Sequence, residues 1–305
     1  MLNLTKNSTK KVLILDGTSL LYRAFYALPE LSTKKGEKTQ GVYGFLLTLF
    51  KEIKEIKPNY IFCCFDLPEK TFRHKKFKEY KAKRKKMPED LKTQIPILEE
   101  ILTAMEIPIF KKEGYEADDL IATLVKKILE KNNFEIFILS GDYDLLQVLK
   151  NNVKLVVFKR GIKEKEIFDE KKVKETFGIS PSQIPDLKAL AGDQSDNIPG
   201  IKGIGKKTAI SLLKVHQNIE KILERVEKGR IVLDLSTTKI LKEKKDELLF
   251  SKFLTTVKEN VKIEFKFKKF GFFDEKRLKE ILKKYEFFSL IKRIPEIKGR
   301  KDFLF

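Results

Sequence analysis

Short apolar runs alternate with amphipathic segments along the first half of the chain. Buried strands are expected at Lys11–Leu15, Tyr60–Phe65, Ile107–Phe110, Glu135–Leu139 and Lys154–Phe158. Helical periodicity fills the intervals between them, at 19–27, 40–57, 88–105, 120–129 and 145–149. Strands separated by helices usually pair in parallel. The pattern therefore predicts an α/β fold with a mostly parallel central sheet and helices on both faces.

The pattern changes after Phe177, where the chain becomes Lys-rich and mainly helical. Pro181 and Pro185 bracket a short helix, and further helices are expected at 217–226, 238–256 and 274–292. A strand-like KIEFKF run lies at 262–267. We therefore divide the chain into an α/β core at 1–178 and a helical region at 179–305.

Acidic residues recur where the predicted strands end and the next helices begin. They are Asp16, Asp66, Glu116, Asp118, Asp119, Asp142 and Asp144. Helix capping explains one or two acids in such places, but not seven in register. Ligand sites in parallel sheets lie beyond the carboxyl ends of the strands, and close carboxylates repel unless a cation or proton lies between them. The positions therefore predict a site for a magnesium-type ion with oxygen ligands.

Composition narrows the function further. Lys and Arg exceed Asp and Glu by 64 − 44 = 20, which indicates a polyanionic partner, either nucleic acid or an anionic membrane surface. No apolar run approaches the roughly 18 residues needed to span a bilayer, so the membrane is the weaker option. The only cysteines, Cys63 and Cys64, are adjacent and suit a reducing cytoplasm. With His74 and His216 as the only histidines, zinc sites and catalytic triads are disfavoured.

The segment 70–86 is densely basic. Ten of its seventeen residues are Lys or Arg, and Phe72, Phe77 and Tyr80 are interleaved among them. A run of charge is usually a solvated surface segment. Aromatic side chains among cations also suit a single nucleic-acid strand, because bases stack while phosphates pair with the cations. The residues alone leave both interpretations open.

A glycine hairpin is expected between helices in the second half. Asp193 and Asp196 precede it, and the hairpin carries Gly200, Lys202, Gly203, Gly205, Lys206 and Lys207. Glycine lets the backbone approach a phosphate, and free N–H groups at the start of the next helix can hold it. Ile201 and Ile204 are expected to anchor the turn in the core. A purely structural helix–helix connection is the alternative, and the glycine spacing is not that of a Walker loop.

Together these motifs resemble a known family. They are Asp16-Gly-Thr-Ser, Val42-Tyr-Gly-Phe, Phe65-Asp66, Phe72-Arg73-His, Tyr80-Lys81, Met87-Pro-Glu-Asp, Gly114-Tyr-Glu-Ala-Asp-Asp, Gly141-Asp-Tyr-Asp, Gly192-Asp-Gln-Ser-Asp-Asn-Ile-Pro-Gly and Gly203-Ile-Gly. They stand in the order seen in the 5′-nuclease domain of bacterial DNA polymerase I, in the flap endonuclease superfamily. The resemblance covers about residues 10–292. It implies a PIN-like 5′-nuclease fold, a basic helical arch or clamp at about 70–90, and a DNA-binding helix–three-turn–helix at about 186–214.

The resemblance also implies roles for individual residues. Asp16, Asp66, Glu116 and Asp118 look like a first metal cluster, and Asp142, Asp144 and Asp193 like a second, with Asp118 near both. Asp119 and Asp196 match further acids of the metal pattern, and the resemblance implies that they act behind the direct ligands. Arg23, Arg73, Lys81 and Arg84 match basic residues that steer the scissile phosphate, and Tyr80 matches an aromatic of the arch. Gly200, Lys202, Gly203, Gly205, Lys206 and Lys207 match the hairpin that holds duplex DNA, often with K⁺. Arg84-Lys-Lys replaces the Arg-Pro-Pro of many relatives and leaves the arch more cationic.

The implied function is structure-specific 5′ nuclease activity on DNA, at 5′ ends and flaps, in primer removal and repair. Two Mg²⁺ ions, with Mn²⁺ as a substitute, would drive it. Expected partners are flap, nicked or 5′-overhang duplexes, RNA-primed 5′ segments and a separate DNA polymerase. A monomer in the bacterial cytoplasm at the nucleoid, without membrane contact, is expected, and Met1 favours a stand-alone protein. The alternatives are a nuclease acting mainly on RNA, a catalytically inactive DNA-binding module and a phosphoacceptor receiver domain. The nine acids argue against inactivity, and the arch and hairpin argue against a receiver.

Overall fold

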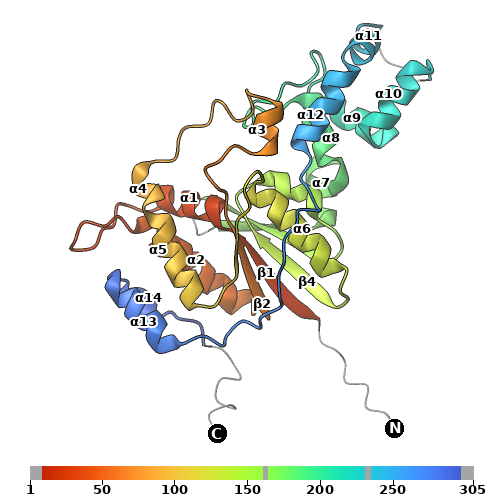
Figure 1. Ribbon diagram of the computed structural model, residues 1–305. Helices are drawn as coiled ribbons and strands as arrows, with labels where there is room; N and C mark the ends of the chain where they lie inside the picture. Colours follow the sequence, from red (N-terminus) through yellow and green to blue (C-terminus); the bar gives the residue numbers. More distant parts are fainter. Residues whose placement is uncertain (1–8, 161–163, 231–234, 297–305) are drawn as a thin grey trace, which may run out of the picture.

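A six-stranded sheet lies at the centre of the computed structural model, which describes residues 9–160, 164–230 and 235–296 (Figure 1). Its order is β3-β2-β1-β4-β5-β6. The strands are β1 (Lys10–Asp16), β2 (Tyr60–Cys64), β3 (Ile109–Phe110), β4 (Phe134–Leu139), β5 (Val153–Arg160) and β6 (Glu164–Phe168). All neighbours pair in parallel except β5 and β6, which are antiparallel. The mostly parallel sheet is confirmed, and the edge strand β6 is an addition that the sequence pattern did not predict.

The alternation of side chains along β1 separates two hydrophobic cores. Leu13 and Leu15 face α1 (Gly17–Ala27), α2 (Gln40–Ile56), α5 (Gln94–Ala104) and α13 (Glu275–Lys284). Val12 and Ile14 face α6 (Ala117–Leu129) and share their core with helices of the C-terminal half. Both faces of the sheet are therefore covered, as the apolar strand runs predicted.

The chain reverses its direction of travel across the sheet at β1. It passes from β1 to β2 and β3 on one side, then returns to place β4 on the other side of β1. Leu15 pairs with Leu139, so the carboxyl ends of β1 and β4 lie side by side. Connections that leave in opposite directions open a crevice at such a switch point.

From α7 (Glu170–Phe177) onward the chain forms a helical lobe beyond the carboxyl ends of the strands (Figure 1). It comprises α7, η2 (Pro181–Gln183), α8 (Ile184–Ala191), α9 (Lys206–His216), α10 (Ile219–Glu227), α11 (Leu235–Glu243) and α12 (Lys245–Thr255). The chain then runs back beside α6 to α13 and α14 (Phe288–Ile291), which pack on α5 and α2. The helical region is thus attached to the core at both of its ends.

Several element predictions are corrected. The segment 262–267 is extended but forms no strand, because its aromatic side chains pack rather than its backbone pairing: Phe265 lies 5.5 Å from Phe62 and Phe267 lies 4.9 Å from Tyr60, between ring centroids. The helix expected at 238–256 breaks at Lys244. The helix expected at 274–292 breaks near Glu286, whose φ is 59°. The helix expected at 88–105 is split into α4 (Glu89–Lys92) and α5, and η1 (Tyr143–Val148) is a 3₁₀ helix in place of the helix expected at 145–149.

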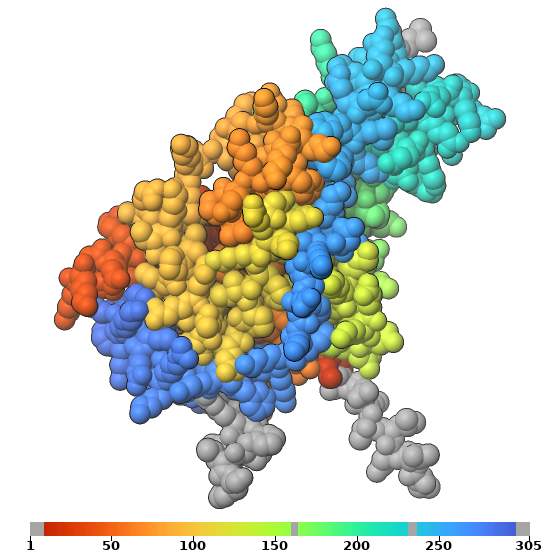
Figure 2. Space-filling model, viewed as in Figure 1, coloured from red at the N-terminus to blue at the C-terminus, as the bar shows by residue number. Residues whose placement is uncertain are grey.

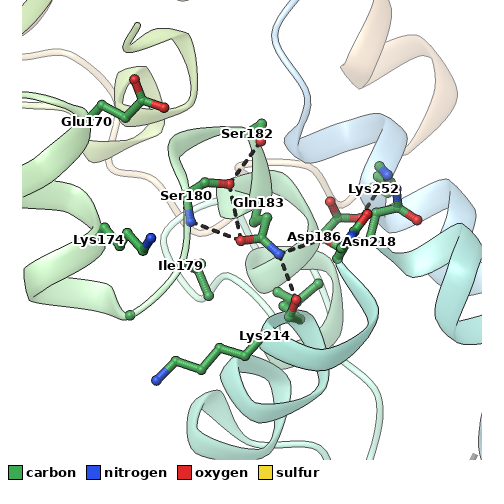
Figure 3. Close-up of a pocket in the computed structure, with 13 residues that line it drawn as sticks. Glu170, Lys174, Ile179, Ser180, Ser182, Gln183, Asp186, Lys214, Asn218 and Lys252 are labelled. Carbon is green, nitrogen blue, oxygen red and sulfur yellow. Dashed lines mark hydrogen bonds and ion pairs between the residues drawn. The ribbon is translucent and has the colours of Figure 1, made fainter. Parts of the chain in front are cut away.

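A polar joint holds α9 in place (Figure 3). The Gln183 amide nitrogen donates to the carbonyl oxygens of Leu213, at 2.8 Å, and Gln217, at 2.7 Å. Nearby, Asp186 accepts from the backbone N–H of Ile219 at 3.1 Å and pairs with Lys252 at 2.8 Å. These contacts tie η2 and α8 to the end of α9, to the start of α10 and to α12.

The hairpin 192–205 between α8 and α9 packs against the hydrophobic core and the end of α8. Ile201 and Ile204 are buried, which confirms that they anchor the turn, and the Ile201 N–H donates to the Leu190 carbonyl oxygen at 2.8 Å. Gly200 lies against the preceding chain: a Cβ there would be 2.4 Å from the Ala191 carbonyl carbon. Gly205 lies in open space, with nothing within 4 Å of an added Cβ.

These contacts separate two glycines of the same loop. We expect Gly200→Ala to lower the free energy of unfolding by about 1–3 kcal/mol, because the methyl group collides with backbone that cannot move aside. Gly205→Ala is the matched control: the added methyl group meets open space, so only the weaker N-cap of α9 should cost stability, by about 0.5–1 kcal/mol. Urea denaturation of both variants measures the difference. Equal stabilities would contradict the close packing at Gly200.

Candidate metal centre

Four carboxylates meet at the switch point of the sheet. Asp16 ends β1, Asp66 follows β2, Asp118 lies in the first turn of α6, and Asp142 follows β4. All four line one cavity of about 590 Å³, together with Glu116. Acids separated by more than a hundred residues in the sequence therefore share one site.

The same acids also cap helices. Asp16 accepts from the backbone N–H of Ser19 at 3.0 Å and from the hydroxyl of Ser140 at 2.5 Å. Asp66 accepts from the backbone N–H of Ala117 at 2.8 Å, at the start of α6. The same carboxylates therefore cap helices and line the cavity, because the helix starts that fix them lie at the cavity.

Electrostatics within the cavity favour a bound cation. Burial and the charge of Asp66 raise the pKa of Asp16 to about 7. Burial and repulsion from Asp142 and Asp16 raise the pKa of Asp118 well above its usual range, and burial also raises that of Asp142. Within the described ranges, Asp16, Asp66, Asp118 and Asp142 form no ion pair. Oxygen donors that repel one another without a counter-charge fit a divalent ion.

A second group of acids lies beside the first. Carboxylate oxygens of Asp144, Asp193 and Asp196 lie within 4.8 Å of one another. Asp193 accepts from the backbone N–H of Ser195 at 2.9 Å and from its hydroxyl at 2.6 Å. Unlike the first group, this one is paired with cations: Lys188 contacts Asp144 and Asp193, and Arg84 lies 2.6 Å from Asp196. The group therefore has the spacing of a cation site, and protein cations contact its carboxylates.

Glu116 faces the basic segment as well as the cavity. Its carboxylate accepts from Lys81 at 2.9 Å, from the Tyr80 hydroxyl at 3.1 Å and from Arg73 at 3.3 Å. Lys81, Arg84 and Lys85 also line the cavity. Three cations of the basic segment are therefore in position to contact a phosphate beside the carboxylates.

Asp119, which matches a further acid of the metal pattern, lies behind the acids that line the cavity. Its side chain is fully buried, and both of its oxygens are occupied by protein donors. One oxygen accepts from Arg73 and from the backbone N–H of Lys258, and the other from Arg73 and the backbone N–H of Glu116. Asp119 therefore does not face the cavity, and it fixes Arg73 and Glu116 instead of binding an ion.

Arg73 and Tyr80 are also placed differently from expectation. Arg73 is 2% exposed and donates to the carbonyl oxygens of Leu254 and Thr256, at 2.9 and 2.8 Å, so its guanidinium is not free to steer a phosphate. Tyr80 is buried, and its hydroxyl donates to Glu116 and to Asp196 at 2.9 Å. Both residues join the basic segment to the acids behind it.

The basic segment lies against the helical lobe. Figure 2 shows the orange segment that contains α3 (Phe72–Lys76) beside α12. Phe72 packs on Phe253 and Phe77 on Phe250, with ring centroids 5.7 and 6.1 Å apart. The expected arch is therefore a short helix followed by turns, and it is docked rather than projecting into solvent.

The remaining expected residues lie outside the cavity. Arg23, on α1, lies beside Gly141 and Tyr143, and burial lowers its pKa. Lys202, Lys206 and Lys207 are exposed on the hairpin, and Gly205 caps α9. Asp193 and the hairpin belong to one loop, closed by paired hydrogen bonds between Asp193 and Ile198. The described part of the chain contains no helix long and apolar enough to cross a membrane.

Sequence reasoning missed two residues of the centre. Ser140 donates to Asp16 and receives a hydrogen bond from the Asp142 N–H, so it joins the ends of β1 and β4. Lys188 bridges Asp144 and Asp193. The position of Ser140 at the end of a predicted strand could have indicated a role in the site. Nothing in the sequence distinguishes Lys188 from the other lysines of a Lys-rich chain.

Comparison with known proteins follows the same division of the chain. Residues 11–178 match the model of the 5′-3′ exonuclease N-terminal resolvase-like domain, and residues 179–278 match that of the 5′-3′ exonuclease C-terminal SAM fold. The chain is 42% identical to DNA polymerase I of Bacillus subtilis over 94% of its own length but only 32% of that protein. It is 41% identical to a 5′-3′ exonuclease of Aquifex aeolicus, covering 94% of this chain and 96% of that one.

Solved structures share the fold at low identity. T5 5′-exonuclease with bound zinc ions superimposes with a TM-score of 0.65 at 21% identity, over 81% of this chain and 89% of that one. The catalytic core of Rad2 in complex with a DNA substrate gives a TM-score of 0.61 at 16% identity, over 93% and 91%. The chain therefore shares its fold with T5 5′-exonuclease and with the catalytic core of Rad2.

The raised pKa values predict how stability depends on pH without metal. Between pH 4 and about 7, folded Asp16 binds more protons than in the unfolded chain, so stability falls as pH rises. Each such carboxyl group contributes a slope of up to about 1.4 kcal/mol per pH unit. Thermal melting in chelator should therefore show a lower melting temperature at pH 7.5 than at pH 5.5, and Mg²⁺ should restore it.

Asp118→Asn is the control for that series, because it removes one repelling carboxylate. Its melting temperature in chelator should depend less on pH. A profile as steep as that of the unmodified chain would place the pH dependence elsewhere.

Proposed function

The chain belongs to the 5′-3′ exonuclease family, and we propose that it hydrolyses DNA phosphodiesters at 5′ ends and flap junctions with two divalent ions. Mg²⁺ is the proposed ion, with Mn²⁺ as a substitute. The observation that carries the proposal is the single cavity lined by Asp16, Asp66, Glu116, Asp118 and Asp142 beside Lys81 and Arg84. Bound divalent ions lower the pKa of a water molecule and stabilise a leaving oxygen.

The side chains divide the work in this proposal. The five cavity acids would hold one ion, and Asp144 and Asp193 would hold the other with Asp142 and Asp118 nearby. Lys81 and Arg84 would orient the scissile phosphate and stabilise the charge that develops on it. Arg73, Tyr80 and Asp119 are positioning residues, because their contacts hold Glu116 and Asp196 rather than reach the cavity.

The substrate would be recognised by its shape and charge. Lys202, Lys206 and Lys207, with the N–H groups at the start of α9, would hold the phosphates of a duplex, and K⁺ at the hairpin carbonyl groups is part of the same proposal. The basic segment 70–86 would bind the single-stranded 5′ end. Affinity should therefore be nearly independent of sequence and should fall steeply with salt.

The wider setting also belongs to the proposal. The chain spans about a third of the DNA polymerase I relatives and nearly all of the Aquifex aeolicus exonuclease. We propose a monomer that acts with a DNA polymerase in primer removal and repair, in the bacterial cytoplasm at the nucleoid. The division into 1–178 and 179–305 is supported by the two family models, although both halves contribute to one hydrophobic core.

Asp118→Asn tests the metal chemistry. We expect a loss of flap cleavage of about 10³-fold or more, because this carboxylate lies between the other acids of the cavity. Affinity for a duplex with a 5′ flap should change by no more than about threefold, since the hairpin is untouched. Cleavage and binding assays across Mg²⁺, Mn²⁺ and chelator measure both effects. Asp246→Asn, on the exposed start of α12, is the control, and normal turnover by Asp118→Asn would remove Asp118 from the site.

Lys81→Ala tests charge stabilisation. We expect the single-turnover cleavage rate to fall by about 10²–10³-fold with little change in affinity, because Lys81 lines the cavity beside Glu116. Lys83→Ala, two residues along the same segment and exposed, should weaken binding without slowing the chemical step. An effect of Lys81→Ala on affinity alone would assign Lys81 to docking.

A further inference from the structure

A lysine occupies the place between two acids of the second group. The Lys188 ammonium contacts Asp144 and lies 2.7 Å from Asp193. Oxygens of these two acids and of Asp196 lie within 4.8 Å of one another, the spacing of a shared cation site. Lys188 comes from the last turns of α8, so its backbone is fixed while its long stem is flexible.

The cations of the centre are unevenly distributed. Asp16, Asp66, Asp118 and Asp142 have no ion-pair partner within the described ranges, and Glu116, the fifth acid of that cavity, pairs with Lys81 and Arg73. Asp144, Asp193 and Asp196 are all paired, two of them with Lys188. A lysine ammonium is a compact charge with donors only, so it contacts the same carboxylate oxygens that a metal ion would use. An ion and the ammonium therefore cannot both lie between Asp144 and Asp193.

We propose that Lys188 is a displaceable counter-ion of the second acid group: it neutralises Asp144 and Asp193 when no metal is bound, and a divalent ion must displace it to bind. This inference rests on the proposed function, since it takes both acid groups to be metal sites. It implies ordered loading, in which the unpaired acids of the first group fill at lower ion concentration than the second group.

A second cavity beside Lys188 can accept the displaced side chain. Lys188 also lines a cavity of about 700 Å³, together with Tyr143, Phe168 and Lys206. Tyr143 is exposed, and its ring lies 5.8 Å from that of Phe168. The ammonium can therefore move from the acids into this cavity by rotation of its stem, without any change in the packing of α8.

Calorimetric titration of the metal-free chain with Mn²⁺ tests the inference. The unmodified chain should bind two ions, the second more weakly. In Lys188→Met the affinity of the second site should rise by about tenfold, while that of the first is unchanged, the scale on which neighbouring groups alter metal affinity. Lys188→Arg keeps the charge and should resemble the unmodified chain. Lys214→Met, an exposed lysine of the pocket in Figure 3, is the control for loss of one charge.

The possible outcomes distinguish the counter-ion role of Lys188 from the proposed nuclease function. Two bound ions with an unchanged or weaker second site in Lys188→Met would overturn the counter-ion role and leave the proposed function standing. No bound ion in the unmodified chain would overturn both. Lys188→Gln, which is neutral and polar, replaces Lys188→Met if the latter fails to fold. Melting in chelator and in Mn²⁺ is a second readout, and Mn²⁺ should raise the melting temperature of either neutral variant more than that of the unmodified chain.

Discussion

Repulsion among buried carboxylates is the constraint on which the rest of this structure depends. A parallel sheet with a switch point brings strand ends together, and here those ends carry acids. Charges so close in a poorly solvated cavity raise one another's pKa and oppose folding unless something offsets them. The chain offsets them with helix starts, hydroxyl donors and a few cations, and among the described residues it leaves Asp16, Asp66, Asp118 and Asp142 without an ion pair. That incomplete compensation favours a divalent ion in the cavity.

A buried ion pair connects this centre to the surfaces around it. Arg73, in the basic segment, donates to Asp119 at the start of α6 and to the Leu254 carbonyl oxygen at the end of α12. Asp119 also accepts from the backbone N–H of Lys258, which follows α12. The basic segment also meets the hairpin loop directly, where Asn197 donates to the Glu79 carbonyl oxygen at 2.8 Å and the Lys81 N–H donates to that of Asp196 at 3.0 Å. Movement of the basic segment therefore disturbs Glu116 and Asp196 at once. The position of the basic segment and the geometry of these acids are therefore coupled.

Features set by local pattern could be predicted from the sequence, and features set by distant partners could not. Apolar strand runs gave the parallel sheet, and the acids after them gave the cavity, because the ends of parallel strands must meet. Asp119 satisfies every local criterion for a ligand, yet Arg73, 46 residues away in sequence, occupies it. Tyr80 lies in a segment whose composition suits strand binding, yet its hydroxyl donates a hydrogen bond to Asp196, 116 residues away in sequence. The run at 262–267 has the alternation of a strand, but its aromatic side chains pack on the rings of Tyr60 and Phe62 without a ladder.

The net charge of +20 acquires a more specific meaning once the acids are located. Most of the cations lie on surfaces, such as the hairpin and the basic segment, whereas the acids of the centre are withdrawn into a cavity. A polyanion is therefore attracted to the surface as a whole but meets carboxylates at the one place where its phosphate could be cut. Binding without a metal ion would put phosphate against carboxylate, which is unfavourable. A divalent ion makes the local charge at the acids positive. The charge pattern would therefore attract nucleic acid to the surface and allow its phosphate to approach the acids only when metal is bound.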